Sequence, residues 1–351
     1  DIGFDEFVFT GADFLLKEDA LTLTEGTLVA GQSGATTVSL TADTFTLTEG
    51  TLSITTATIV TLVADSFTLT DGTVSIGVST KISPILDTFT LTDGTLLVQQ
   101  AQDVTPVADT FTLSDGTLVI RAEQESRITL IADTFTLTDG TTSITTGSRI
   151  TPVADTFTLT DGTLSISTAT AITLIADTFT LTDGTLTIDV TQDINLIADS
   201  LTLTDGTLVI DQEQDVFLVA DSFTITDGAL LVQQDQNVTL TADALVITDG
   251  TVSVTTGSRV TLTPDAFSLT DGAITISQEQ DVFLLADTFT LSEGTLNIFA
   301  EQETTVDLVP DALAIDPGIM SIKASGNTSV GLIHPHLILT AGALTIYQDV
   351  N

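Results

Sequence analysis

Residues 176–188 read ADTFTLTDGTLTI, and this stretch decides the fold of the chain. Phe179 and Leu181 alternate with threonines before the Asp183-Gly184 pair, and two more apolar residues alternate with threonines after it. An alternation of period two is typical of strands with one buried face, and threonine favours the same structure. The stretch therefore predicts two β-strands, TFTLT and TLTI, joined by a turn.

The same pattern recurs almost end to end along the chain. Indexed on the glycine of its turn, it occurs fifteen times from Gly26 to Gly342, with a spacing of 22 residues ten times and 24 residues four times. A third apolar run, INLI at 194–197 in this repeat, predicts a third strand in each unit. The longer units carry their extra residues between the second and third strands, as at 121–127 and 299–305, where we expect a surface loop. Such self-similarity indicates an all-β repeat protein in which each unit mainly contacts its neighbours.

Two all-β folds are compatible with the repeat. In a β-solenoid of about 15 coils, with 22–24 residues per coil, equivalent strands stack in parallel about 4.8 Å apart and form continuous apolar ladders. In the alternative, each Asp-Gly pair is a tight hairpin turn that sets Leu181 opposite Leu186 and Phe179 opposite Ile188, and such hairpins build a trimeric fibre shaft. The near-constant unit length favours the solenoid, because coils of equal circumference need it.

Three prolines argue for an irregularity in the third strand. Pro84, Pro106 and Pro152 stand where other units have leucine. A proline removes one backbone hydrogen bond from a central strand. We therefore expect this strand to be short, with a corner or a bulge at that position.

The repeat divides the chain into three segments. Residues 1–18 are rich in phenylalanine and depart from the pattern, so we expect an N-terminal cap or docking segment there. Residues 19–318 form the regular array, and residues 319–351 are divergent repeats whose last unit stops after its second strand. A single unit buries too little apolar surface to stand alone, so the open end predicts either a longer parent chain or head-to-tail association.

The charge of the chain excludes several classes of function. Its 351 residues include 48 acidic and 7 basic residues, for a net charge of -41, which repels nucleic acid and anionic membranes. There is no cysteine, and no stretch is apolar for long enough to form a transmembrane helix. The only histidines, His334 and His336, lie in a divergent unit, where a surface pair is a plainer interpretation than a metal chelate. No catalytic triad, phosphate loop or zinc spacing is present, so we expect no enzyme activity and no required cofactor.

Acidic residues recur at two positions of the unit. One opens the first strand and the other lies in the turn, where aspartate favours turns by bonding to nearby backbone N–H groups. Stacked units would line up these like charges, so we expect mobile cations to screen them or bound Ca²⁺ to bridge them. The candidate cation-screened ladders are Asp109, Asp133, Asp155, Asp177, Asp199 and Asp221 at the strand position, and Asp115, Asp139, Asp161, Asp183, Asp205 and Asp227 in the turn.

Threonines occupy the outward positions of the first strand, as at Thr178, Thr180 and Thr182. This pattern resembles the Thr-x-Thr arrays of insect-type ice-binding solenoids, although acidic rows flank it here. Across about residues 19–350 the repeat resembles, in general style, β-solenoid adhesins, phage or viral fibre shafts and extracellular filament subunits. The resemblance implies a non-catalytic structural element outside the cell, on a cell surface or on a virion. It further implies self-association, either end to end or as a trimer, with an adhesin stalk or an ice-binding rod as alternatives.

Overall fold

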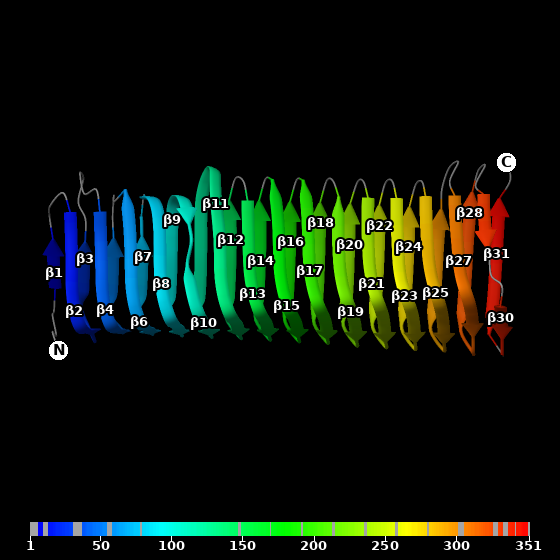
Figure 1. Cartoon of the computed structure of the whole chain (residues 1–351), viewed down its shortest axis with the longest axis horizontal. Helices are drawn as coiled ribbons and strands as arrows, with labels where there is room; N and C mark the ends of the chain where they lie inside the picture. Colours follow the sequence, from blue (N-terminus) through cyan, green and yellow to red (C-terminus); the bar gives the residue numbers. More distant parts are fainter. Residues whose placement is uncertain are drawn as a thin grey trace. The chain divides into compact units, whose positions relative to one another are not determined.

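The structure is a computed structural model of the chain (Figure 1). It describes residues 6–9, 13–30, 37–54, 58–77, 79–146, 149–168, 170–190, 192–212, 215–234, 237–256, 259–278, 281–300, 305–325, 329–332, 336–340 and 342–349. Every regular element in these ranges is a β-strand. The chain divides into two compact units, Asp1–Ala176 and Asp177–Asn351.

Long and short strands alternate along both units except around β10, which takes the place of a long strand although its 8 residues are fewer than the 10 of β9, and which is followed directly by the 22-residue β11. In the first unit the longer strands are β2 (Asp13–Leu23), β4 (Thr37–Thr48), β6 (Ile59–Thr70), β8 (Ser79–Thr92), β10 (Val107–Ser114), β11 (Thr117–Thr138) and β13 (Arg149–Thr160). The strands between them are β1 (Glu6–Phe9), β3 (Thr27–Ala30), β5 (Thr51–Ile54), β7 (Thr73–Ile76), β9 (Thr95–Val104), β12 (Thr141–Thr146) and β14 (Thr163–Thr168).

The second unit follows the same alternation, and β15 (Ala171–Thr182) runs across the boundary. Its other long strands are β17 (Asp193–Thr204), β19 (Val216–Thr226), β21 (Asn237–Thr248), β23 (Arg259–Thr270), β25 (Asp281–Ser292) and β27 (Thr305–Ile315). The remaining strands are β16 (Thr185–Val190), β18 (Thr207–Gln212), β20 (Ala229–Gln234), β22 (Thr251–Thr256), β24 (Ala273–Gln278), β26 (Thr295–Ala300), β28 (Ile319–Ser325), β29 (Ser329–Leu332), β30 (His336–Leu339) and β31 (Ala343–Asp349).

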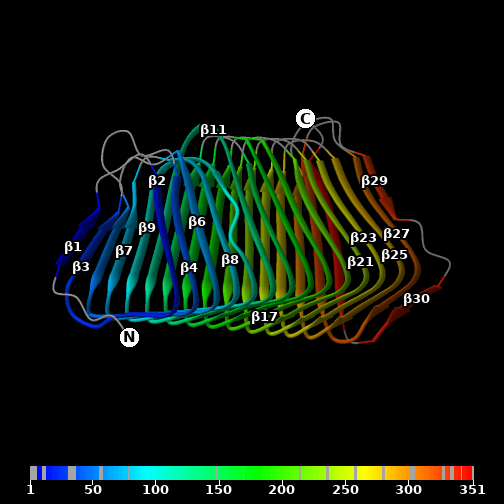
Figure 2. The same ribbon diagram turned by 60° about the vertical axis from the view of Figure 1, so that its left-hand side comes forward.

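Equivalent strands of consecutive repeats pair in parallel, so the fold is a parallel β-solenoid, as the sequence predicts. In the first unit Phe135 of β11 aligns with Phe157 of β13, one repeat further on. In the second unit Ala220 of β19 aligns with Ala242 of β21. Figure 2 shows β4, β6 and β8 side by side in the first unit, and β21, β23 and β25 side by side in the second. Chemically equivalent residues therefore stack along each unit.

The hairpin alternative is wrong. The two strands that flank an Asp-Gly pair do not pair with each other across a hairpin, because each pairs with its equivalent in the neighbouring repeat. In the turn before β11, Asp115 N donates to the Thr138 carbonyl of the next coil at 3.0 Å, and Thr117 N donates to the Gly94 carbonyl of the preceding coil at 2.9 Å. The backbone of the Asp-Gly turn is therefore hydrogen-bonded to the coils on both sides of it.

The predicted third and first strands are one strand with a corner. In β13 the burial alternates up to Ala154, then Asp155 and Thr156 both face outward, and the alternation resumes at Phe157. The backbone ladder between β11 and β13 skips the aspartate at this corner. Figure 2 shows the long strands bending. Two consecutive outward residues reverse the phase of the alternation, which lets both halves of one strand face the same core.

The solenoid has about 13 turns, slightly fewer than the glycine count suggests. Twelve turns carry an acidic residue in the left-handed region, from Glu49 to Glu293. The turns at Gly26, Gly318 and Gly342 depart from this form, since none of them has such a residue before the glycine. Counting glycines therefore includes atypical turns at both ends.

Stacked apolar side chains fill the interior of each unit. Phe45, Phe67, Phe89, Phe111, Phe135 and Phe157 form a ladder in the first unit, in which neighbouring ring centroids lie 4.6–5.2 Å apart. The next inward leucines of the same strands, such as Leu47 and Leu137, are fully buried. Stacked rings at this spacing add to the free energy of burial.

The corner does not lie where the prolines predict it. Pro84 and Pro152 are accommodated within β8 and β13, where they align with Leu62 and Leu130. Only at Pro106 does the strand break, between β9 and β10. The corner falls three and four residues after the proline position, at the aspartate and the residue that follows it, such as Asp155 and Thr156 in β13.

The expected loops have different outcomes. The insertion at 121–127 is part of β11, which accommodates it by register shifts against β9. Of the insertion at 299–305, residues 301–304 lie outside the described residues. The divergent N-terminal segment already takes part in the stack, because β1 pairs in parallel with β3 and β2 with β4.

Candidate functional surfaces and the buried cavity

The acidic residues of the turns form one row, which we call the turn ladder, and the backbone conformation of the turn explains why they stand there. Its acidic residues are exposed and have φ angles of 53–56°, in the left-handed region. Aspartate enters this region more readily than most residues with a Cβ. The structure thus places Asp115, Asp139 and Asp161 in one row in the first unit, and Asp183, Asp205 and Asp227 in one row in the second. The physical reason is the left-handed conformation, which the sequence reasoning did not identify.

The aspartates at the strand corners form a second row, which we call the corner ladder. The outward threonines of the second half of each long strand, which we call the threonine face, lie between the corner ladder and the turn ladder. Asp109, Asp133 and Asp155 in the first unit, and Asp177, Asp199 and Asp221 in the second, are all exposed at the corner of a long strand. Parallel neighbours place such residues about 4.8 Å apart. Each ladder therefore carries one negative charge per coil.

Like charges in the turn ladder influence each other. A hydrogen bond with Asp271, together with the negative charge of that residue and a smaller effect of burial, raises the pKa of Glu293 above its ordinary value of 4.5. The two residues occupy the turns that precede β24 and β26, one repeat apart. A shared proton between neighbouring coils relieves their repulsion.

The ladders do not form a cage for a metal ion. Among the described residues, no three histidine, cysteine, aspartate or glutamate side chains come close enough together to hold one. A Ca²⁺ ion takes six to eight oxygen ligands, whereas a single column offers only adjacent carboxylates. Screening by mobile cations and bridging by Ca²⁺ therefore both stay predictions. His334 and the side chain of His336 lie outside the described residues, so neither the expected surface pair nor a metal chelate is tested.

Threonines form ordered columns on the second half of the long strands. Thr112 aligns with Thr136, and Thr136 aligns with Thr158. The corner aspartates border these columns on one side and the turn aspartates border them on the other, as at Asp109 and Asp115. The face is regular, and its borders are acidic.

The first half of the long strands carries a surface that the sequence reasoning missed. Lys81, Asp103, Arg127 and Arg149 occupy one column, and all four side chains are exposed. Three of the seven basic residues of the chain thus share one edge of the first unit. The signal was present in the sequence, because each of these four residues stands six positions before the corner aspartate of its repeat.

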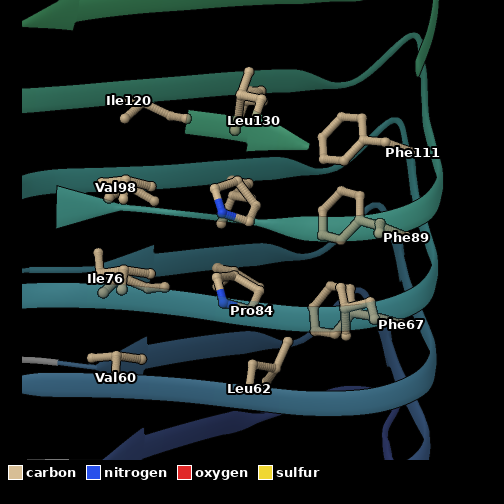
Figure 3. Close-up of a pocket in the computed structure, with 18 of the residues that line it drawn as sticks. Val60, Leu62, Phe67, Ile76, Pro84, Phe89, Val98, Phe111, Ile120 and Leu130 are labelled. Atoms are coloured by element: carbon tan, nitrogen blue, oxygen red, sulfur yellow. The ribbon is translucent and has the colours of Figure 1, made fainter. Parts of the chain in front are cut away.

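A cavity of about 60 Å³ lies in the core of the first unit (Figure 3). Its lining is apolar and includes Phe67, Phe89 and Phe111 on one side, with Pro84 and Pro106 beside them. Figure 3 shows Pro84 in the row that Leu62 and Leu130 also occupy. Pro84 and Pro106 are smaller than the leucines at the equivalent positions of other coils, and they leave this space unfilled. An apolar cavity of this kind stays dry and offers dispersion contacts alone.

Side chains also link coils in the second unit. The Asn237 Nδ2 donates to Asp215 Oδ1 at 2.8 Å, and the Thr305 backbone N–H donates to Asp281 Oδ1 at 2.9 Å. The Arg259 guanidinium lies 5.5 Å from the centre of the Phe283 ring, within the range of a cation–π contact. These contacts link neighbouring coils near the first residues of β19, β21, β23, β25 and β27.

The described part of the chain contains no helix long and apolar enough to cross a membrane. Comparison with protein-family models, with curated proteins and with solved structures finds no match to this chain.

Proposed function

We propose that the protein is a non-catalytic structural subunit of an extracellular fibre or filament, and that it associates end to end. The observation that carries this proposal is the in-register parallel stacking, in which each coil presents to the next the same backbone and side-chain pattern that it receives. Repetition of one contact along an axis is the geometry that generates filaments. The acidic exterior suits a saline environment and opposes unspecific aggregation.

Among the described strands, β31 pairs with β28 alone, and this favours the addition of a further strand along its other side. β31 pairs with β28, and Ile346 aligns there with Ile322, which is fully buried. Ile346 itself is 45 % exposed, although it belongs to the same inward column. Ala343 N donates to the Gly318 carbonyl at 2.8 Å, and N–H groups alternate in direction along a strand. Every second residue, such as Leu344 and Ile346, therefore directs its N–H group away from β28, which is a template for another strand.

Electron microscopy of the purified chain tests the proposal. We expect filaments at high protein concentration, with a meridional reflection near 4.8 Å in fibre diffraction. The variant Ile346→Asp buries a charge in the proposed joint and should abolish filaments. The control Thr345→Asp adds the same charge at an outward position of the same strand and should not. Isolated particles at every concentration, or filaments of Ile346→Asp, would overturn end-to-end association.

A second candidate function, ordering of surface water by the threonine face, is favoured by the alignment of its columns. Thr90, Thr112, Thr136 and Thr158 align in a single column of hydroxyl and methyl groups. The acidic rows on both borders oppose this function, because strongly hydrated charges disturb an ordered water layer. An ice-recrystallisation assay distinguishes the two functions, since a structural subunit leaves the growth of ice grains unchanged. An adhesin stalk would instead appear as separate particles on a native cell surface.

A further inference from the structure

The first half of the long strands in the first unit, together with the end of β9, presents an outward face, which we call the lateral face. It consists of four parallel columns, because outward residues alternate along each strand. The basic column contains Lys81, Asp103, Arg127 and Arg149, and the hydroxyl column contains Thr61, Ser83, Thr105, Thr129 and Thr151. The apolar column contains Val63, Ile85, Val107, Ile131 and Val153, and the acidic column contains Asp65, Asp87, Asp109, Asp133 and Asp155.

The apolar column is exposed and continuous. Ile85 is 52 % exposed and Ile131 is 41 % exposed, and the valines between and beside them are half-buried. Each residue aligns with the next in the register of β6, β8, β10, β11 and β13. Single exposed apolar residues are common on protein surfaces, whereas a contiguous apolar patch marks an interaction site.

The two borders of the lateral face carry opposite charges. Lys81, Arg127 and Arg149 are exposed on one border, and the corner aspartates of the same strands are exposed on the other. The borders lie six positions apart, as Arg149 and Asp155 do, which corresponds to about 20 Å along a strand. The lateral face is thus an unusual part of a chain whose net charge is -41.

We propose that the lateral face binds the lateral face of a second copy of this chain. A two-fold axis parallel to the stacking direction reverses the order of the columns without changing their level. It places the basic column of one copy against the acidic column of the other, so Arg127 faces Asp133 of the second copy and Arg149 faces Asp155. Lys81 faces Asp87 in the same way, whereas Asp103 faces Asp109 and this one pair repels. The same operation places the apolar column against the hydroxyl column, in which every residue except Ser83 is a threonine with a methyl group.

The size of the face agrees with a reversible dimer. Five coils at about 4.8 Å and a width of about 20 Å give about 500 Å² per copy, or about 1,000 Å² in total, which is near the lower limit for a specific interface. At about 0.15 M salt, charges more than about 8 Å apart are largely screened. The distant acidic residues of the two copies then repel weakly, while ion pairs in contact persist.

Sedimentation equilibrium of the full chain at this salt concentration tests the apolar contact. We expect a monomer–dimer equilibrium, and the double variant Ile85→Thr/Ile131→Thr should weaken it at least tenfold. The fold tolerates threonine at this register, because Thr41, Thr241 and Thr263 occupy it elsewhere. The control Leu97→Thr, at an outward position of β9 on another face, should leave the dissociation constant unchanged. A monomer at all concentrations, or equal effects of both variants, would overturn the proposal.

A charge exchange tests the orientation of the two copies. Arg127→Glu/Arg149→Glu should weaken the dimer at least tenfold, and addition of Asp133→Arg/Asp155→Arg to this variant should restore it. Restoration requires that the two borders meet, so a failure of restoration contradicts the two-fold arrangement.

Association through the ends is separated from lateral binding by the Ile346→Asp variant. Lateral binding does not require filaments, so the dimer should persist in this variant and respond to the lateral-face substitutions there as in the parent chain. Because the chain has no cysteine, a spin label can be placed at Thr129→Cys alone. Short distances between labels at this position, absent for the control Ser143→Cys on β12, support the lateral dimer. If Ile346→Asp removes all association, lateral binding is wrong while end-to-end association stands.

Discussion

At the scale of single residues, the Asp-Gly pair forms a turn that stacks on the turns of the neighbouring coils and does not form a hairpin. The aspartate takes the left-handed conformation, with φ 53° at Asp71. The glycine then passes close to the preceding coil: a Cβ on Gly72 would lie 2.9 Å from the Gly50 carbonyl oxygen and 2.7 Å from Leu69 Cδ1. A backbone oxygen cannot move aside as a flexible side chain can. The pair is therefore required by two separate constraints, one on φ and one on space.

The first constraint predicts opposite results for two substitutions of Asp115. Asp115→Asn keeps a residue that tolerates the left-handed region and removes one charge from the ladder, so stability should be unchanged or slightly increased. Asp115→Val should lower the free energy of unfolding by about 1–2 kcal/mol, because a β-branched residue is strained at positive φ. Urea unfolding of both variants measures the difference. Equal stability of the two variants would show that the conformation imposes no constraint.

The raised pKa of Glu293 predicts a dependence of stability on pH. A carboxyl whose pKa is higher in the folded state than in the unfolded state stabilises fully below the unfolded pKa, and this contribution is lost as the pH rises through the folded pKa. Acidification from neutral pH toward the ordinary value of 4.5 should therefore raise the melting temperature. The increase should be smaller in Glu293→Gln than in Glu18→Gln, which removes a charge from β2 instead. An identical pH dependence in both variants would contradict the interaction with Asp271.

At the scale of elements, periodicity predicts which residues face the core but not where a strand ends. The alternation placed Phe179 and Leu181 correctly on the inward side, where both are fully buried. It also suggested separate strands at 194–197 and after it, whereas β17 continues through the corner to Thr204. Two adjacent outward residues look like a break in a sequence pattern. Only the backbone shows that the strand continues through them.

Cavity filling in the proline row predicts a gain of stability. Pro106→Leu restores the residue type of Leu62 and Leu130 and should raise the free energy of unfolding by about 1 kcal/mol, given about 24 cal/mol per Å³ of cavity and a partly offsetting gain in the entropy of the unfolded chain. Chemical denaturation measures the change. The control Pro264→Ala restores the residue type of Ala242 at a position that does not line this cavity, and it should change stability by less than about 0.5 kcal/mol. A destabilised Pro106→Leu would show that the space is too small for leucine.

At the scale of the molecule, the repeat made the solenoid and its acidic ladders predictable, while the lateral face and the cavity were not. Identical residues at a fixed spacing reveal which positions stack, so Asp109 and Asp133 could be placed in one row. Residues that depart from the repeat occur at only a few positions, so the sequence alone does not show which of them stack. Lys81 and Arg127 gain significance only when the register aligns them, and the space beside Pro106 depends on side chains from several coils.

The same stacking predicts that dissolved cations stabilise the protein. Two unit charges about 4.8 Å apart repel by about 1 kcal/mol in water, and few basic residues are present to compensate two acidic ladders. Screening removes much of this repulsion, so the melting temperature should rise steadily with sodium chloride concentration. Millimolar Ca²⁺ should stabilise as well, through its charge.

A ladder variant provides the control for this effect. Replacement of Asp115, Asp139 and Asp161 by asparagine keeps residues that tolerate the left-handed region but removes three adjacent charges of the first unit, so it should raise the melting temperature at low salt and flatten its salt dependence. Calorimetry of both proteins at several salt concentrations makes the comparison. Melting temperatures that do not change between low salt and millimolar Ca²⁺ would contradict repulsion within the ladders. The acidic surface would then have no electrostatic influence on how the coils hold together.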